Sequence, residues 1–284
     1  MPDARILREY GEEPGVVRLT INNPQKRNTY DPQMRDQLAA YLGEAAQDDD
    51  VKVVHLRGAD GIFSTGADMN NAYAWYGDGK AKGRRPSQRR RLTVDRRTFA
   101  FYHEFIGFPK VTVAEISGFA LGGGLELALA ADIAVIARDT RIGMPATRFL
   151  GPALGSLHLF FHRLGPVLTR RMLLTGDLIE AGELEGLGVF TEFTDAGSVA
   201  ARADYWARKA ARMPADGIVI AKEMFRLVEQ LQAYQGEEVL SYVTHAFGTN
   251  LRFEEDEFNF VKARAKHGTK EAFRLRDEHF DVDG

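Results

Sequence analysis

The chain has 284 residues, of which 44% are apolar, and it contains no cysteine. This composition supplies a buried core but is too polar for an integral membrane protein, and the missing thiols exclude disulfide scaffolds, thiolate metal sites and cysteine nucleophiles. The formal net charge of -3 excludes the broad positive field that general nucleic-acid binding requires. No long apolar run follows Met1, so we expect a cytoplasmic protein without a signal peptide.

Strands and one long helix are predicted in the first half of the chain. Residues 6–10 and 16–21 are short strands that flank a turn containing glycine and proline. Asp31 followed by Pro32 is typical of a helix start, and apolar residues at helical spacing extend this helix to about Gln47. Further strands are predicted at residues 51–56, 111–116 and 133–137, with a short helix beginning near Gly124 between the last two.

The second half of the chain is mainly helical by its pattern. Helices are predicted at residues 166–175, 181–187, 198–212, 214–235 and 269–280. The repeated strand-strand-helix pattern before Ala137 indicates a layered α/β architecture. We therefore divide the chain into an α/β core, residues 1–200, and a helical C-terminal region, residues 201–284.

Residues 80–97 form the most basic segment, since nine of these 18 positions are Lys or Arg. One interpretation is a solvated, mobile loop that leads into a helix. The alternative is a basic rim for a phosphate-bearing ligand.

The first glycine-containing motif spans residues 61–69, with the sequence Gly-Ile-Phe-Ser-Thr-Gly-Ala-Asp-Met. It follows a predicted strand, and we expect a helix to start near Ala67 and Asp68, where an acidic residue suits the first turn. Such a junction can direct unpaired backbone N–H groups into a cleft.

The second motif spans residues 117–127 and contains Gly122, Gly123 and Gly124 in a row. These glycines let the backbone approach a ligand closely. The third glycine of a dinucleotide fingerprint is missing, and no Gly-Lys-Ser/Thr follows, which excludes both nucleotide motifs. Either motif alone is explained by a tight helix–sheet turn, but two such junctions about 55 residues apart are what a two-donor oxyanion hole needs.

The two motifs together strongly resemble those of the crotonase (enoyl-CoA hydratase/isomerase) superfamily. Residues 23–28 are similar to its first CoA-contact segment, and residues 173–189 to a typical helical stretch, so the resemblance covers most of the chain. It implies a crotonase-like spiral of strand-strand-helix units with a helical C-terminal region. It also implies an acyl-CoA thioester as substrate, no separate cofactor because coenzyme A is part of that substrate, and a homotrimer or a hexamer.

The resemblance also implies roles for individual residues. The N–H groups of the oxyanion hole map onto Ala67 and Gly123, and the first of two catalytic carboxylates maps onto Glu126. The alternative for Glu126 is a glutamate on a helix surface. Other implied substrate contacts are Lys26, Arg27, Asn28, Asp68, Met69, Gly122, Ala146 and Thr147.

The sequence departs from the family pattern at the second carboxylate, whose expected position falls on Ala146 or Thr147. Hydration needs one proton taken from water and another delivered to carbon. Without a second carboxylate, these two proton transfers cannot be divided between two side chains. The leading prediction is an enoyl-CoA hydratase-like lyase of fatty acid metabolism. The alternatives are another enolate reaction, namely C–C or thioester hydrolysis or decarboxylation, and a catalytically silent acyl-CoA binder.

Other residues have two interpretations each. His158 and His162 share a helix face and suit metal ligation or a reach into the acyl pocket, but no third ligand is identifiable, so no metal site is predicted. Arg148 binds a carboxylate of the acyl group or is simply exposed.

The segment from residue 70 to about residue 99 is long, which predicts an enlarged or differently covered acyl pocket. The aromatic residues in and after this segment are predicted to form core or pocket wall. They are Tyr73, Trp75, Tyr76, Phe99, Tyr102 and Phe105. Residues 253–258 resemble an acidic helix start and are given no catalytic role.

Overall fold

The central element is a six-stranded sheet in the order β1-β2-β3-β4-β6-β9. A computed structural model of the chain describes residues 5–69, 76, 87–151, 154–231, 240–245, 253 and 257–281. The strands are β1 (Ile6–Tyr10), β2 (Val16–Ile21), β3 (Val53–Gly58), β4 (Val111–Ile116), β6 (Ile133–Ala137) and β9 (Glu192–Thr194). β1 pairs antiparallel with β2 and every other pairing is parallel. A second sheet contains β5 (Phe119–Leu121), β7 (Arg141–Gly143) and β8 (Leu178–Glu180).

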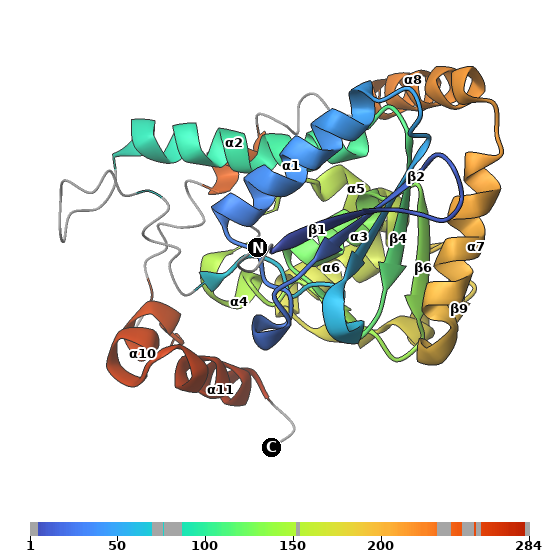
Figure 1. The fold of residues 1–284 in the computed structure, drawn as a ribbon. Helices are drawn as coiled ribbons and strands as arrows, with labels where there is room; N and C mark the ends of the chain where they lie inside the picture. Colours follow the sequence, from blue (N-terminus) through green and yellow to red (C-terminus); the bar gives the residue numbers. More distant parts are fainter. Residues whose placement is uncertain are drawn as a thin grey trace.

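Both faces of the large sheet are covered by helices, which explains why its parallel strands are almost wholly apolar. Val54 points to the side of α1 (Pro32–Gln47) and α3 (Gly123–Ala130), whereas its neighbour Val53 points to α7 (Val199–Ala211). This alternation is the two-residue period of a strand. Figure 1 shows α1 and α7 on opposite sides of the strands.

The remaining helices lie at several places around this core (Figure 1). They are α2 (Gln88–Ile106), α4 (Thr147–Leu150), α5 (Leu157–Arg163), α6 (Gly165–Thr175), α8 (Ala215–Leu231), α10 (Phe260–His267) and α11 (Thr269–Phe280). α10 and α11 form a pair that lies apart from the sheet in Figure 1 and packs through Phe260 and Ala272 against Phe149 of α4. Within the described ranges, none of the helices combines the length and apolar character needed to cross a bilayer.

Most predicted elements are found, several with the predicted bounds, and three differ, one of them the helix start expected near Ala67. The strand expected at residues 51–56 runs from Val53 to Gly58. The helix expected at residues 181–187 was a wrong prediction, because only a 3-10 segment, Ala181–Leu184, forms there. Gly186 and Gly188 follow with positive φ values of 88° and 72°, which interrupts any longer helix.

α7 shows that the helical part of the chain contributes to the sheet core. It begins at Val199 and packs Ala203 and Ala207 against Val113 and Val135 of the large sheet. The first helix after residue 200 therefore covers a sheet face and forms one body with the strands.

Candidate active site

A cavity of about 710 Å³ lies where the two glycine-containing segments face α2, α4, α10 and α11. Ala67, Gly122, Gly123 and Glu126 all border it. The structure therefore brings the predicted oxyanion-hole residues and the predicted carboxylate to one place. Its volume is within the range of small-molecule sites.

The segment around Ala67 is extended, so the helix predicted to begin at Ala67 and Asp68 was a wrong prediction. Ala67 forms an isolated parallel bridge with Tyr30. The Tyr30 N–H donates to Gly66 O at a distance of 2.9 Å, and the Tyr30 carbonyl oxygen accepts the Asp68 N–H at 3.0 Å. Because neighbouring amides in an extended chain point to opposite sides, the Ala67 N–H points away from Tyr30.

The second segment presents its N–H at the start of α3. Gly122 has φ 55° and ψ -128°, a conformation that favours glycine, and donates to Gly143 O over 2.9 Å. Gly123 follows as the first helical residue, whose N–H has no acceptor inside the helix. No residue that the structure describes accepts a hydrogen bond from the N–H of Gly123 or of Ala67.

The two segments touch each other beside these N–H groups. A Cβ atom added to Gly66 would lie 3.0 Å from the Gly123 nitrogen and 2.7 Å from Leu121 O. The absence of a side chain at Gly66 therefore permits the close approach. Two unpaired N–H groups border the same cavity from adjacent strands of backbone, which is the arrangement that stabilises a developing oxyanion.

Glu126 lies in the first turn of α3 and is only 3% exposed, so the surface-glutamate interpretation was wrong. Its Oε2 accepts the Gly155 N–H over 2.8 Å and the Ser156 hydroxyl over 2.7 Å. None of the described residues donates to Oε1, and Glu126 borders the cavity. Burial raises the pKa of Glu126 to about 7, although both hydrogen bonds act in the opposite direction. The carboxyl group can therefore take up and release a proton near neutral pH.

α2 supports the loop that holds Glu126. His103 Nε2 lies 2.5 Å from Gly155 O, and a Cβ atom on Gly155 would lie 2.6 Å from a ring carbon of Phe99. Ser156 is fully buried. The loop therefore packs tightly against α2, and this packing holds the Gly155 N–H and the Ser156 hydroxyl in position to donate to Glu126.

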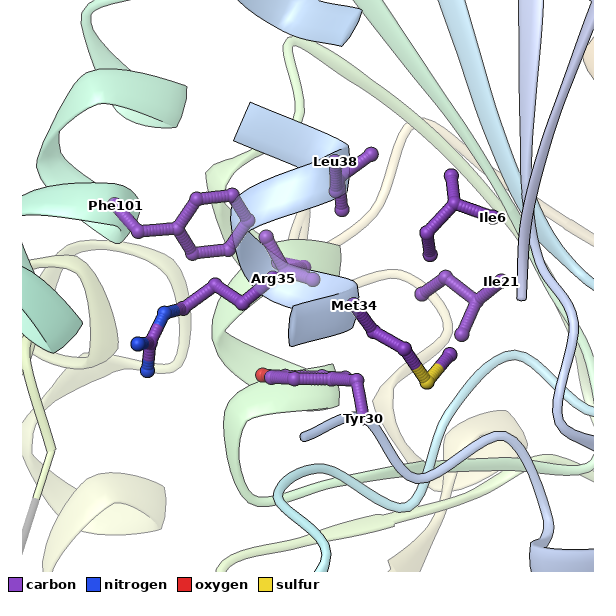
Figure 2. A pocket seen from close by; sticks show the side chains of 8 residues that line it. Ile6, Ile21, Tyr30, Met34, Arg35, Leu38 and Phe101 are labelled. Atoms are coloured by element: carbon purple, nitrogen blue, oxygen red, sulfur yellow. The ribbon is translucent and has the colours of Figure 1, made fainter. Parts of the chain in front are cut away.

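A pair of tyrosines packs against the other side of Gly123. The hydroxyl oxygens of Tyr30 and Tyr102 are 2.6 Å apart and buried, and burial raises the pKa of both groups above its usual range. A Cβ atom on Gly123 would lie 2.1 Å from each hydroxyl oxygen. In Figure 2 the Tyr30 ring lies below Met34, and its hydroxyl points to the same side as the Arg35 guanidinium.

Lys26 and Arg27 border the cavity at its exposed edge, together with Asp68 and Met69. Lys26 Nζ donates to Asp68 Oδ2 over 2.8 Å. These positions agree with a contact to the polar part of a ligand, and the positive charge of both side chains suits phosphate oxygens.

Asn28 has a different place from the one predicted, because it is fully buried and does not border the cavity. Its Oδ1 accepts the Asn23 N–H over 2.9 Å, and its Nδ2 donates to the carbonyls of Ala59 and Ile62 over 2.8 and 2.5 Å. Asn28 therefore joins the turn that carries Lys26 to the first glycine-containing segment.

Replacing Asn28 with alanine is expected to lower the free energy of unfolding by about 2–4 kcal/mol, because buried backbone groups lose their partners. Urea denaturation measures this change. Lys26→Ala is the matched control, since the Lys26 side chain is 50% exposed and its loss should leave stability close to wild type. Equal stabilities for the two variants would contradict the structural role of Asn28.

The position expected for the second carboxylate is occupied by Ala146, which borders the cavity at the start of α4. Thr147 donates its hydroxyl to Met144 O over 3.1 Å and is not part of the cavity wall. Arg148, predicted to be exposed or to bind a carboxylate of the acyl group, is not exposed and does not border the cavity. Its side chain is 15% exposed, donates to Thr175 O and lies 3.4 Å from Asp177.

The histidine pair does not contribute to the cavity. His158 is partly buried outside the cavity wall, where burial lowers its pKa to about 4, and His162 is exposed. Within the described parts of the chain, no group of three or more His, Asp or Glu side chains has an arrangement that could hold a metal ion.

The basic and aromatic segments are only partly within the described residues. Residues 80–86, Tyr73, Trp75 and residues 254–256 lie outside them. From Gln88 onward the basic segment is the helix α2, in which Arg91 turns inward to the cavity. Tyr76, Phe99 and Tyr102 form cavity wall and Phe105 lies in the core, as predicted.

The raised pKa of Glu126 makes stability depend on pH. The unfolded carboxyl loses its proton near pH 4.5, whereas the folded one keeps it to about pH 7. The folded state therefore binds the extra proton in this window, and the free energy of unfolding falls as the pH rises, by about 3 kcal/mol in total. Glu126→Gln should match wild type at pH 4 and be more stable at pH 8 in urea denaturation. An identical difference at both pH values would contradict this pKa.

Sequence analysis missed the residues that support the reacting groups. Ser156, Gly155 and His103 come from distant segments, and no motif marks them. Tyr102 carried a weak signal, because it lies on one helix face with Phe99 at a spacing of three residues. Both residues were predicted as core or pocket wall, but the contact of Tyr102 with Gly123 was not predicted.

The sequence and the fold are similar to those of known proteins. The sequence matches the enoyl-CoA hydratase/isomerase family over residues 11–267. A putative enoyl-CoA hydratase of Thermus thermophilus is 29% identical over 213 residues, which are 75% of this chain and 81% of that protein. The 1,2-epoxyphenylacetyl-CoA isomerase of Escherichia coli is 27% identical over 76% of this chain and 80% of its own length. The crystal structure of an enoyl-CoA hydratase/isomerase from Xanthobacter autotrophicus superposes with a TM-score of 0.81, at 27% identity, over 98% of this chain and 99% of that one.

Proposed function

Because the chain belongs to the enoyl-CoA hydratase/isomerase family, we propose that it hydrates an enoyl-CoA with Glu126 as its single acid–base group. The crotonase-like fold expected from the sequence is confirmed. One observation carries the proposal. A buried carboxyl group with a pKa of about 7 borders the same cavity as two backbone N–H groups that have no acceptor among the described residues.

In the proposed reaction, water adds to the β-carbon of the enoyl thioester while Glu126 Oε1 accepts the proton that water loses. The electron pair of the double bond moves toward the thioester oxygen, where the N–H groups of Ala67 and Gly123 stabilise the enolate. Protonated Glu126 then donates its proton to the α-carbon, and the carbonyl re-forms. The double bond has gained one water molecule, and Glu126 is a carboxylate again.

Coenzyme A would extend from the thioester toward the exposed edge of the cavity. Lys26 and Arg27 lie there and supply positive charge for its phosphates. The pairing of Lys26 with Asp68 keeps the ammonium group near the Ala67 segment.

A second candidate function uses the same enolate for C–C or thioester hydrolysis or for decarboxylation. The observation that favours it is Ala146, which leaves the second proton-transfer position of the cavity wall without a carboxylate. These reactions need the oxyanion hole but not the same two proton transfers.

The test is incubation of the purified protein with 2-enoyl-CoAs in D₂O, followed by product analysis by NMR. Hydration by one carboxylate should give a 3-hydroxyacyl-CoA with the hydroxyl and the α-deuterium on the same face of the former double bond. Release of free coenzyme A instead, or of carbon dioxide from a 2-carboxyacyl-CoA incubated in parallel, would support the second candidate. Binding of acyl-CoA without any turnover would indicate a silent binder and reject both reactions.

We also propose that α8 packs against a second copy of the chain, in a trimer or a hexamer. α8 exposes a run of large apolar side chains, among them Ile220, Met224, Phe225 and Leu231, each at least 58% exposed. Contiguous apolar surface of this kind is typical of an interface.

Light scattering after gel filtration tests this assembly and should give the mass of at least three copies. Phe225→Asp should shift the protein to the monomer, whereas Tyr10→Asp, at a 69% exposed tyrosine of β1, should leave the mass unchanged. A wild-type monomer would contradict the proposal.

A further inference from the structure

One face of α2 forms a long wall of the cavity. Arg91, Asp95, Thr98, Phe99 and Tyr102 all border it, at spacings that place them on one side of a helix. The Tyr102 end lies against Gly123 and therefore beside the oxyanion hole. The opposite end carries two charged side chains, Arg91 and Asp95, whereas the other three residues of the wall are uncharged.

These charges belong to a distal polar cluster, which consists of Tyr76, Arg91, Asp95 and His245. Asp95 is 1% exposed and its Oδ1 accepts the Tyr76 hydroxyl over 2.7 Å. His245 Nδ1, from the helical residues 240–245, lies 2.9 Å from Asp95 Oδ2. The Arg91 guanidinium lies 5.4 Å from the centre of the Tyr76 ring. All four residues border the cavity.

The cluster is too far from the oxyanion hole to replace the missing catalytic carboxylate. Asp95 and Tyr102 are seven residues apart, which corresponds to about 10 Å along a helix. Phe99 separates them, with its ring centre 5.2 Å from that of His245 and 6.5 Å from that of Tyr102. Proton transfer requires contact at about 3 Å, so these groups cannot reach the α-carbon of a thioester held by Ala67 and Gly123.

The distance instead matches the far end of an acyl group. A hydrogen bond accounts for about 3 Å of the 10 Å, and the remaining 7 Å are spanned by about six bonds of an extended chain. A hydrocarbon end placed there would remove water from buried charges without replacing its hydrogen bonds.

The sign of the local charge indicates which polar group fits. Among the residues that the structure describes at this end of the cavity, Arg91 and Arg35 supply two cations and Asp95 supplies one anion. Arg35 is buried behind the wall and donates to the hydroxyl of Thr98, which itself borders the cavity. Its acidic neighbour Asp36 is 3.9 Å away and 42% exposed, so solvent screens that charge.

We infer that the distal polar cluster selects acyl-CoAs whose acyl group bears an oxygen-containing polar group about six bonds beyond the thioester carbon, with a carboxylate preferred to a hydroxyl. This inference rests on the proposed function only in taking the cavity as the acyl-CoA site. It concerns which acyl group is bound and is independent of the reaction that follows.

The test compares three saturated seven-carbon acyl-CoAs that end in a methyl, a hydroxyl or a carboxylate group, with binding measured by calorimetry. The wild-type protein should bind the carboxylate at least tenfold more tightly than the methyl compound, with the hydroxyl between them. Equal affinities would overturn the inference, and a hydroxyl preferred to the carboxylate would overturn its charge argument.

Variants identify the group responsible. Arg91→Met should lower affinity for the carboxylate compound at least tenfold and leave that for the methyl compound unchanged. Arg89→Met, at an exposed position of the same helix, is the control and should change neither. If Arg91→Met fails to fold, the wild-type ligand series still decides.

Binding of acetyl-CoA tests the acyl-CoA site alone, because its acyl group is too short to reach the distal polar cluster. Binding of acetyl-CoA with no discrimination among the longer compounds overturns this inference alone. Failure to bind any acyl-CoA overturns the proposed function as well.

Discussion

Replacing Glu126 with glutamine is expected to lower kcat by about 10²–10⁴-fold, while acyl-CoA affinity stays close to wild type. Glutamine has the same shape, and its Oε1 can accept the hydrogen bonds that Gly155 and Ser156 now donate to the carboxylate. It cannot take a proton from water or deliver one to carbon. Steady-state kinetics and calorimetry with the same enoyl-CoA measure the two quantities separately.

The dependence of kcat on pH provides a second test of the role of Glu126, with Ser156→Ala as the matched variant. Wild-type activity should fall as the pH drops below about 7, where Glu126 becomes protonated and can no longer accept a proton from water. Ser156→Ala removes one hydrogen bond that favours the charged form, so it should move this inflection to higher pH and retain part of the activity. An enzyme that keeps more than about a tenth of its kcat after Glu126→Gln would show that another group transfers the proton.

Gly123→Ala is expected to lower kcat/KM by about 10²–10³-fold and to reduce the melting temperature. The new methyl group would lie 2.1 Å from the hydroxyl oxygens of both Tyr30 and Tyr102, so the start of α3 must move. This displacement takes the Gly123 N–H out of line with the oxyanion.

Relief of that clash is the control for this prediction. In a Tyr30→Phe/Tyr102→Phe background both hydroxyls are gone, and the nearest remaining contact of the added methyl group is a ring carbon of Tyr102 at 3.2 Å. Gly123→Ala should therefore cost much less activity in this background than in the wild type. The same loss in both backgrounds would mean that the glycine is required for a reason other than the tyrosine pair.

Sequence analysis correctly predicted the parts of the site that depend on backbone conformation. It did not predict the parts that depend on packing between segments far apart in the chain. The Gly122–Gly123 turn marks itself, because its conformation requires glycine. Asn28 was expected to contact the ligand, since residues 23–28 resemble the first CoA-contact segment of the family. Its burial becomes visible only when the segments of residues 23–28 and 59–62 meet.

Ala67 shows a second reason for a wrong prediction. A glycine-containing segment that ends in Ala-Asp is compatible with a helix start by local preference, but the bridge to Tyr30 holds the segment extended. Tertiary pairing of this kind overrides local propensity. The inferred role of the N–H survives, because an extended residue beside a bridge also directs its amide away from the partner strand.

In the proposed function, different groups bind the thioester and transfer the protons. In that proposal the backbone N–H groups of Ala67 and Gly123 bind the thioester oxygen, whereas proton transfer depends on side chains such as Glu126 and on the small residue Ala146 at the start of a four-residue helix. Exchange of side chains at the second set of positions can alter the reaction without rebuilding the first. A binding site built from backbone atoms can therefore serve different reactions when a few side chains around it are replaced.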